Sequence, residues 1–321
     1  MCRIYAGIIA YNPDIDRLRD NISSVLPQVQ GLIVVDNGSK NLNDVRKLIE
    51  ELQVELQADT SDSVSGNSDS GANGKIQIVE NSENKGVAYA LNQIMHEAVK
   101  YGRADWVLTL DQDTVVYDNL VGMYRSFIDG KISDKSQNGK VINADKIASI
   151  TCLRHDRNYV EKNVNGGGKA DSDCEWEYVE SCITSGNLIS VCAWKKVHGF
   201  DNRLFIDMVD DEYCYRLREC GYHIVRINSY GFLHELGENL KTVKFFGREK
   251  TIFAYSPKRK YYTARNTIYM IRRYKLGIVN EYSKYLSKRF VGTLLYEKNK
   301  LRGLSAYFKG FFAGFKLDCT K

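Results

Sequence analysis

Short apolar runs alternate with longer amphipathic segments along the first third of the chain. The runs have the length of strands and are rich in Ile, Val and Leu, and they occupy residues 4–10, 31–35, 76–79 and 106–110. Between them, apolar residues recur every three or four positions, as on one face of a helix, within 14–26, 42–52 and 85–99. Continuously apolar strands separated by helices predict an α/β fold with a Rossmann-like, mainly parallel sheet that is flanked by helices on both faces.

Polar, low-complexity stretches interrupt this pattern at three places. Residues 59–75 are rich in Ser, Gly and Asp and predict a flexible surface loop between a helix and the next strand. Residues 129–146 and 163–175 are weaker interruptions of the same kind. After residue 240 the composition becomes basic and aromatic, so we expect two regions, 1–240 and 241–321.

Charge is distributed unevenly between these two regions. Residues 241–321 contain 20 Lys and Arg and only four acids, whereas the preceding 240 residues carry a net charge of −11. A basic region of this kind predicts contact with an anionic surface or partner. Within it, residues 285–290 and 304–317 combine aromatic side chains with Lys, as an interfacial helix on anionic lipid does. A pair of core-packing helices with a solvated basic face explains the same pattern equally well.

Cysteine usage and hydropathy indicate a reducing compartment. None of the eight cysteines forms a C-x-x-C pair and several lie in apolar runs, which favours free thiols over a disulfide framework. Residues 1–11 are too short an apolar stretch for a secretory signal, and no run of 18 apolar residues predicts a transmembrane helix. We therefore expect a cytoplasmic protein whose basic region gives it access to the inner face of the membrane.

Acidic and amide side chains follow several of the predicted strands. Asp111 and Asp113 come directly after the run 106–110, at the edge where parallel sheets bind their ligands. Two carboxylates one residue apart can hold Mg²⁺ or Mn²⁺ together with substrate phosphates. A plain polar turn is the alternative interpretation, and the position after a buried strand favours the metal.

Two further strand ends carry candidate ligand-binding residues. Asp36 can accept hydrogen bonds from a base or a ribose, or it can form an Asx turn with the residues that follow it. Gly86 allows the backbone to approach a ligand at the start of a helix, where phosphate is favoured. For Asn84, which lies just before it, a simple N-cap is the more common role.

The densest acidic cluster lies within residues 204–221. Asp207, Asp210 and Asp211 fall at or near the start of a predicted helix, where the helix dipole favours negative charge. One of these carboxylates could serve as the general base for a hydroxyl nucleophile. His234 follows a strand-like run at 223–227, and a single His of this kind is more often structural than a ligand.

Taken in order, these segments resemble family-2 glycosyltransferases of the GT-A fold, most closely the bacterial rhamnosyltransferase branch. Each motif is short, but the ordered set is specific and spans roughly residues 3–275. The resemblance implies a catalytic domain that binds a nucleotide sugar at 1–240, and a helical region at 241–321 that is membrane-proximal or binds the acceptor. The matching stretches are Ala6–Asn12, Val34–Ser39, Asn84–Asn92, Leu110–Thr114, Thr184–Ile189, Gly199–Arg218 and Tyr261–Asn266.

The resemblance also implies a donor site. Asp36 matches the carboxylate that reads the base or the ribose, and Asp111 and Asp113 match the D-x-D pair that holds the donor diphosphate with Mg²⁺ or Mn²⁺. His234 is similar to a late His that approaches the metal or the phosphate in many relatives. The remaining positions that the resemblance places near the donor are Asn12, Asn84, Gly86 and Arg265.

The base and the acceptor site follow from the same resemblance. Asp210 falls where the family places its general base. Many members have Glu-Asp at this point and this chain has Val209-Asp210, so Asp207 and Asp211 remain alternatives. Gly186 and Asn187 are implied at the acceptor site, and Arg265 serves either the diphosphate or the acceptor.

The resemblance implies an inverting transfer of a sugar to a hydroxyl of a glycan or of a lipid-linked, diphosphate-bearing saccharide, in the synthesis of a surface polysaccharide. Rhamnose from dTDP-rhamnose is the expected donor, with a UDP-hexose or a GDP-sugar as alternatives. A nucleotidyltransferase is disfavoured, because residues 10–14 lack a Gly-rich phosphate loop. A non-catalytic nucleotide- or nucleic-acid-binding protein is the other class. The acidic first region and the lack of an RNA-recognition or zinc-finger signature lead us to expect no nucleic-acid partner.

Overall fold

The structure divides the chain into two compact units. The first contains Met1–Asp201 and Tyr213–Leu236, and the second contains Asn202–Glu212 and Gly237–Lys321. Most of the predicted loop at 59–75, and of the interruptions at 129–146 and 163–175, lies outside the described residues. The computed structural model describes residues 2–61, 75–130, 144–156, 174–234, 240–245, 248–253, 255–297 and 299–320.

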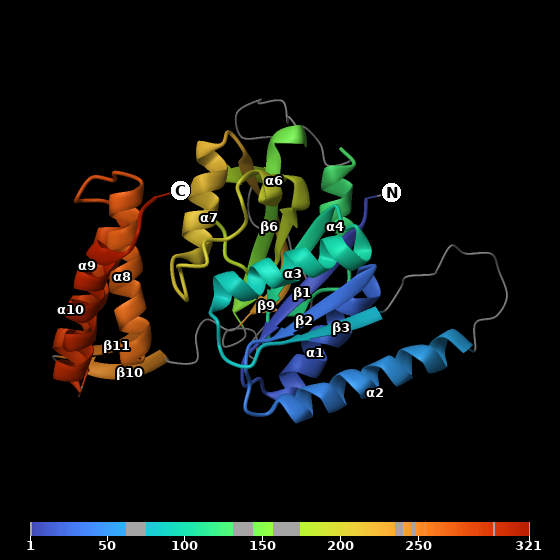
Figure 1. Cartoon of the computed structure of the whole chain (residues 1–321), viewed down its shortest axis with the longest axis horizontal. Coiled ribbons are helices and arrows are strands. Elements are labelled where there is room, and N and C mark those ends of the chain that lie inside the picture. Colours follow the sequence, from blue (N-terminus) through green and yellow to red (C-terminus); the bar gives the residue numbers. More distant parts are fainter. Residues whose placement is uncertain are drawn as a thin grey trace. The chain divides into compact units, whose positions relative to one another are not determined.

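The first unit is built on a nine-stranded sheet. Its strands are β1 (Ile4–Ala10), β2 (Gly31–Asp36), β3 (Lys75–Glu80), β4 (Trp106–Asp111), β5 (Val115–Val116), β6 (Ile147–Asp156), β7 (Trp176–Val179), β8 (Asn187–Ser190) and β9 (His223–His234). They lie in the order β3-β2-β1-β4-β8-β6-β9-β5, with β7 paired to β9 (Figure 1). The pairs among β1, β2, β3 and β4 are parallel, as predicted, whereas β8 runs antiparallel to both β4 and β6.

Helices cover both faces of this sheet. They are α1 (Ile15–Val25), η1 (Leu26–Gln28), α2 (Leu42–Ser61), α3 (Val87–Gly102), α4 (Leu120–Ile128), η2 (Ala144–Lys146) and α6 (Val191–Lys196), and α7 (Val209–Glu219) begins in the second unit and ends in the first. On one face, Ile8 of β1 shares a core cluster with Leu18 and Ile22 of α1. On the other, Gly7 lies against α3, where a Cβ would come within 2.0 Å of the Ile94 side chain. Because both faces are covered, the strand is apolar at every position, and this explains the continuous run in the sequence.

The second unit combines a hairpin with three helices. Its strands β10 (Leu240–Phe245) and β11 (Arg248–Phe253) pair antiparallel, and its helices are α8 (Pro257–Arg273), α9 (Glu281–Tyr296) and α10 (Lys300–Lys316). The sequence predicted helices in this region but not the hairpin. No helix in the described part of the chain is both long and apolar enough to cross a membrane.

Two of these helices begin at residues that satisfy their first backbone N–H groups. The Ser256 side chain accepts a hydrogen bond from the backbone N–H of Arg259, and Pro257, at the first position of α8, has no N–H to satisfy. Asn280 and Ser283 form a reciprocal capping box at the start of α9. These caps fix where α8 and α9 begin.

Glycines determine how α10 packs on α8. Gly310 is buried, and a Cβ there would lie 2.1 Å from the carbonyl oxygen of Tyr261 in α8. At Gly314 a Cβ would lie 2.6 Å from the carbonyl oxygen of Arg265. The two helix backbones therefore approach more closely than any side chain at these positions would allow.

We expect Gly310→Ala to destabilise the chain although alanine is the better helix former. The added methyl meets backbone atoms of α8, which cannot move aside, and overpacking of this kind costs about 1–3 kcal/mol. Gly292→Ala in α9 is the matched control, because nothing lies within 4 Å of a Cβ at Gly292. It should stabilise the chain by roughly 0.5–1 kcal/mol. Thermal unfolding followed by circular dichroism measures both, and equal midpoints for the two variants would contradict the close helix contact.

Candidate active site

Three parallel strands place their carboxyl ends side by side. Asp36, at the end of β2, is level with Ala10 of β1, and Asp111, at the end of β4, is level with Ile9 on the other side of β1. The two aspartates predicted as ligand-binding residues therefore stand on either side of the end of one strand. Ligands of parallel sheets bind at this edge.

Asp36 is fully buried and only half satisfied. Its Oδ1 atom accepts hydrogen bonds from the backbone N–H groups of Gly38 (3.1 Å) and Ser39 (2.9 Å), so the predicted Asx turn is present. Its Oδ2 atom is also buried and has no hydrogen-bond partner among the described residues. A buried carboxylate oxygen without a donor is unfavourable. The turn therefore leaves one acceptor available for an N–H or O–H group of a ligand.

The loop before α3 shows a different arrangement from the one that the sequence favoured. The N-cap of α3 is Gly86, with φ of 91°, and no side chain caps the helix. Asn84 is therefore not the N-cap; its Oδ1 atom accepts from the backbone N–H of Gly86 (2.9 Å) and lies 3.3 Å from Nδ2 of Asn37. Only glycine adopts this φ readily. No side chain caps the first N–H groups of the helix, and such a helix start favours the binding of phosphate.

Asn12 connects the loops that follow β1 and β2. Its backbone N–H donates to Oγ of Ser39, and its Oδ1 atom accepts from the backbone N–H of Lys40, both at 2.8 Å. Asn12 itself has a positive φ of 47°, which Asn tolerates better than most residues. The contacts shown are structural, and binding of the donor by Asn12 stays a prediction.

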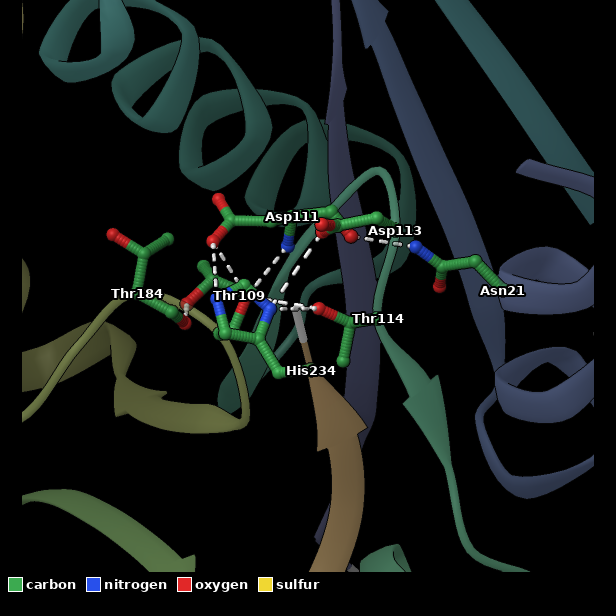
Figure 2. A network of polar contacts seen from close by, with 8 residues as sticks. Asn21, Thr109, Asp111, Asp113, Thr114, Thr184 and His234 are labelled. Carbon is green, nitrogen blue, oxygen red and sulfur yellow. Dashed lines mark hydrogen bonds and ion pairs between the residues drawn. The ribbon is translucent and has the colours of Figure 1, made fainter. Parts of the chain in front are cut away.

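The predicted metal ligands Asp111, Asp113 and His234 come together at the ends of β4 and β9 (Figure 2). His234 Nε2 lies 3.8 Å from Asp111 Oδ2, and His234 Nδ1 lies 3.6 Å from Asp113 Oδ1. The Thr114 hydroxyl lies 3.2 Å from Nδ1 of the same ring and 3.0 Å from the hydroxyl of Ser185. Residues more than 120 positions apart in sequence thus form one polar cluster.

Backbone and hydroxyl contacts hold Asp111 in place. Its backbone N–H donates to Oγ of Ser185 at 2.9 Å, and the Ser185 hydroxyl donates to Asp111 Oδ2 at 2.7 Å. The Asn21 amide of α1 donates to its carbonyl oxygen at 2.7 Å (Figure 2). The Thr109 hydroxyl donates to the carbonyl oxygen of Thr184, which fixes the loop that carries Ser185. These contacts orient the first carboxylate of the pair.

The sequence singled out neither Ser185 nor Thr114. Both lie in stretches that match the family, 184–189 and 110–114, but as small polar residues they carry no distinctive spacing. Their contact with Asp111 and His234 joins segments about 70 and 120 positions apart. The signal in the sequence that could have identified Ser185 and Thr114 is a hydroxyl side chain within a stretch that matches the family.

The donor set fits a divalent cation in its chemistry. Asp111 has 43% of its side chain exposed, so its carboxylate is accessible to a ligand, whereas His234 is only 13% exposed. Carboxylate oxygens are the ligands that Mg²⁺ and Mn²⁺ prefer, and imidazole can complete such a set. Within the described ranges, no group of three or more His, Cys, Asp or Glu side chains is arranged to hold a metal ion. Binding of a metal here stays a prediction.

The two residues predicted at the acceptor site are enclosed by neighbouring strands. Gly186 has a φ of 72°, and a Cβ there would lie 2.2 Å from the ring of Phe232. Asn187 is 4% exposed, and its Oδ1 atom accepts a hydrogen bond from the Ser149 hydroxyl. Both residues are thus packed against neighbouring strands, and their acceptor role stays a prediction.

In the second unit, α8 fixes the segment that leads into α7. Asp207 and the next residue have positive φ values of 64° and 61°, an uncommon conformation for residues other than glycine. The Asn266 amide donates to the carbonyl oxygens of both Ile206 and Asp207 at 2.8 Å. The Asp207 carboxylate accepts from Arg259 Nε at 3.0 Å and from the Thr263 hydroxyl at 2.6 Å. Both oxygens are thus engaged, which argues for a structural role rather than for Asp207 as the base.

The acidic first turn of α7 contains three different environments. Glu212 is fully buried, accepts from the Tyr274 hydroxyl at 2.6 Å and pairs with Arg273. Burial, together with the nearby charges of Glu281 and Asp207, raises the pKa of Asp211 to about 6. Asp210, the second residue of the helix, is intermediate in exposure and lies where the sequence placed the base.

Arg265 braces the same segment. Its guanidinium donates to the carbonyl oxygen of Arg203 at 2.5 Å and to Oδ1 of Asn266 at 2.8 Å, and it stacks on the ring of Tyr262. These contacts are structural, so its role toward a diphosphate or an acceptor stays a prediction. The predicted residues therefore form two groups, one at the sheet edge of the first unit and one in the second unit.

We expect Asp211→Asn to stabilise the chain in a pH-dependent way. The pKa is about 6 in the folded chain against an ordinary 3.8. As pH rises between these values the unfolded chain loses its proton first, so wild-type stability falls, and above pH 6 the loss is constant. The amide removes it, and we expect a gain of about 2 kcal/mol at pH 7.5 that disappears at pH 4. Unfolding midpoints against pH, with the exposed Asp118→Asn as control, measure this; a gain that persists at pH 4 would indicate a packing effect instead.

Comparison with known proteins shows which family and which solved structures the chain is similar to. Residues 5–131 match the family model described as glycosyl transferase family 2. The dTDP-rhamnosyl transferase RfbF of Shigella flexneri is 25% identical, over 93% of this chain and 90% of that protein. Among solved structures, S. aureus TarS 1-349 in complex with UDP-GlcNAc matches with a TM-score of 0.50 and 12% identity, over 96% of this chain and 79% of the other.

A second structure supports the same fold. GalNAc-T7 with UDP, GalNAc and Mn²⁺ matches with a TM-score of 0.52 and 14% identity, over 98% of this chain and 56% of the other. At such low identity both structures show the fold alone, and they confirm the predicted GT-A type. Residues 5–131 therefore belong to glycosyl transferase family 2, and the chain is a glycosyltransferase of the GT-A fold that resembles a rhamnosyltransferase.

Proposed function

We propose that this glycosyltransferase transfers rhamnose from dTDP-rhamnose, with inversion, to a hydroxyl of a glycan or lipid-linked saccharide in the synthesis of a surface polysaccharide. The observation that carries the proposal is the pairing of a half-satisfied buried carboxylate, Asp36, with the Asp111, Asp113 and His234 cluster across the end of β1. The choice of sugar follows the Shigella relative, which is a dTDP-rhamnosyl transferase. A UDP-hexose or a GDP-sugar is the alternative donor.

The position of Asp36 suits the nucleoside end of the donor. Its buried Oδ2 atom can accept one hydrogen bond from a base N–H or a ribose hydroxyl, while Oδ1 stays in the turn. Because Oδ2 is shielded from water, leaving it without a hydrogen-bond donor is unfavourable. A ligand that has no N–H or O–H group at this point would therefore bind more weakly. Asp36 thus contributes to the selection of a nucleotide.

The D-x-D pair suits the diphosphate end. Asp111 and Asp113 bring two carboxylates to one side of His234, and a diphosphate placed beside them would be repelled. Asp111 and Asp113, with His234 close by, would hold a divalent cation that offsets this repulsion. When bound, Mg²⁺ or Mn²⁺ would stabilise the negative charge of the departing nucleoside diphosphate. The contacts of Ser185 and Thr114 keep the carboxylate and the imidazole in position for this.

Asp210 is the proposed general base. It removes the proton of the acceptor hydroxyl while that oxygen forms a bond to the anomeric carbon of the sugar. The bond from that carbon to the phosphate oxygen breaks, and the nucleoside diphosphate leaves with the electron pair, so the configuration inverts. The engagement of Asp207 with Arg259 and Thr263 argues against Asp207, and the family resemblance, which places the base at Asp210, supports Asp210 over Asp211. Residues 1–240 would form the catalytic region, and 241–321 would serve the acceptor or the membrane.

A screen of donor hydrolysis tests the donor and the D-x-D pair. With Mn²⁺ present, we expect nucleoside diphosphate to be released from dTDP-rhamnose and not from UDP- or GDP-sugars. Asp113→Ala should lower this release about 100-fold or more, because one of the two carboxylates that would hold the cation is lost. Asp118→Ala, an exposed carboxylate five residues further on, should leave it unchanged. Release from a UDP-sugar would replace the proposed donor, and nucleotide binding without release from any donor would indicate a binding protein.

A pair of amide variants tests the base. We expect Asp210→Asn to bind dTDP-rhamnose with unchanged affinity in calorimetry and to lose donor hydrolysis about 100- to 10,000-fold, as the removal of a general base does. Asp211→Asn should retain both binding and hydrolysis, since the family resemblance places the base at Asp210 and not at Asp211. Loss of hydrolysis in Asp211→Asn with full activity in Asp210→Asn would move the base to Asp211.

A further inference from the structure

Large apolar side chains gather on the surface of the second unit. Of the thirteen large hydrophobic residues that are exposed in the described part of the chain, ten lie between 278 and 315. The ten are Ile278, Val279, Val291, Leu294, Leu295, Leu301, Phe308, Phe311, Phe312 and Phe315. Scattered exposed apolar residues need no explanation, but a concentration of this kind on one helical bundle indicates an interaction surface.

Helix α10 carries five of these residues, and four of them lie along one face. Leu301, Phe308, Phe312 and Phe315 are spaced by seven, four and three positions, which places them along one side of a helix. Three of the phenylalanines are more than half exposed, at 55%, 63% and 51%. The opposite face, which carries Gly303, Tyr307, Gly310 and Gly314, is buried. The close glycine contact with α8 therefore fixes which face of α10 points outward.

The aromatic face is continuous with its neighbours. The Phe311 ring lies edge-to-face against both Phe312 and Phe315, with centroids 5.6 Å and 5.1 Å apart. Phe308 makes the same kind of contact with Phe290 of α9 at 5.8 Å. Helices α9 and α10 lie side by side in the bundle (Figure 1). We call the exposed apolar residues of α10 the aromatic face, defined by Leu301, Phe308, Phe311, Phe312 and Phe315.

A stripe of positive charge borders the aromatic face. Arg302, Lys309 and Lys316 are spaced by seven residues, and all three are exposed. Each follows a residue of the aromatic face, so the stripe lies about 100° around the helix from it. Helix α10 contains no acidic residue. We call Arg302, Lys309 and Lys316 the basic stripe.

The aromatic face and the basic stripe together favour one kind of binding partner. A second copy of this chain would bring the same basic stripe against the first in a two-fold contact, and the like charges would repel. The surface of an anionic bilayer satisfies both features, because phenylalanine enters the boundary between headgroups and acyl chains while Lys and Arg stay with the phosphates. With no described helix able to span a bilayer, the helix would lie on the surface.

We propose that the aromatic face and the basic stripe of α10 dock this chain on the surface of an anionic membrane, with the axis of α10 in the plane of the interface. The proposal does not depend on which donor or acceptor is used. It accounts for the composition of residues 241–321, in which 20 basic residues accompany only four acids.

Flotation of the full chain with lipid vesicles tests this proposal. We expect the chain to float with vesicles of 30% phosphatidylglycerol in phosphatidylethanolamine and not with pure phosphatidylcholine. The double variant Phe308→Ser/Phe312→Ser should lower the partition coefficient at least tenfold, by removal of inserted apolar surface. Lys309→Gln/Lys316→Gln should lower it about fivefold for each charge, with the difference shrinking at high salt.

A matched control distinguishes vesicle binding through this surface from nonspecific hydrophobic binding. Val54→Ser/Tyr101→Ser removes two exposed apolar residues of the first unit, at 66% and 60% exposure, and should float like the wild type. Circular dichroism should show all variants folded, since the altered side chains are exposed. Absence of flotation, or flotation unaffected by the phenylalanine changes, would overturn the proposal. A second result would also overturn it. If light scattering shows a dimer that Phe308→Ser/Phe312→Ser converts to a monomer, and if neither protein binds vesicles, the occupant of this surface is a second copy of the chain. Donor hydrolysis without vesicles, measured in parallel, keeps this result distinct from the proposed function.

Discussion

Parallel pairing of β1 with both β2 and β4 is the constraint on which the site depends. Backbone hydrogen bonds set the register, so Asp36 ends level with Ala10 and Asp111 ends level with Ile9. A slip of one residue would turn every side chain of a strand to the opposite face, and because helices pack on both faces it would place side chains where they do not fit, such as beside Ile94, where only Gly7 leaves room. The burial of both faces therefore fixes the register, and the register fixes the separation of the two carboxylates. The positions of these acids follow from the packing of apolar residues below them.

Negative charge at this edge is balanced in two different ways. Asp36 is buried and uses one oxygen in the turn to Gly38 and Ser39, which leaves the other for a ligand. Asp111 and Asp113 face His234 with a partly exposed carboxylate, where a cation and a diphosphate can enter together. Hydroxyl groups of Ser185 and Thr114 hold this second group without adding charge. Shielded hydrogen bonding and accessible charge thus lie on opposite sides of one strand, as a ligand with a nucleoside at one end and phosphates at the other requires.

In the second unit, α8 uses two of its faces for separate purposes. Arg259, Thr263 and Asn266 bind Ile206 and Asp207 just before the acidic start of α7, where Asp207 and Met208 have positive φ values. Tyr261 and Arg265 present backbone carbonyls to Gly310 and Gly314 of α10. Because glycine allows this close contact, the phenylalanines of α10 are directed away from α8. The same helix therefore positions the candidate base and exposes the aromatic face.

The sequence by itself determined the α/β architecture and the strand ends. Strands buried on both faces must be apolar throughout, so 31–35 and 106–110 were identified to within one residue of β2 and β4, and the acids that follow them were found with them. The family resemblance supplied roles for Asp36, Asp111, Asp113 and Asp210. Only the tertiary structure decided that Ser185 and Thr114 hold the cluster, that Gly86 rather than Asn84 begins α3, that Asp207 is engaged by α8, and that β10 and β11 form a hairpin. Local periodicity indicates which residues of one segment are buried. These features depend instead on contacts between distant parts of the chain, and the pattern within one segment does not identify the segment that it contacts.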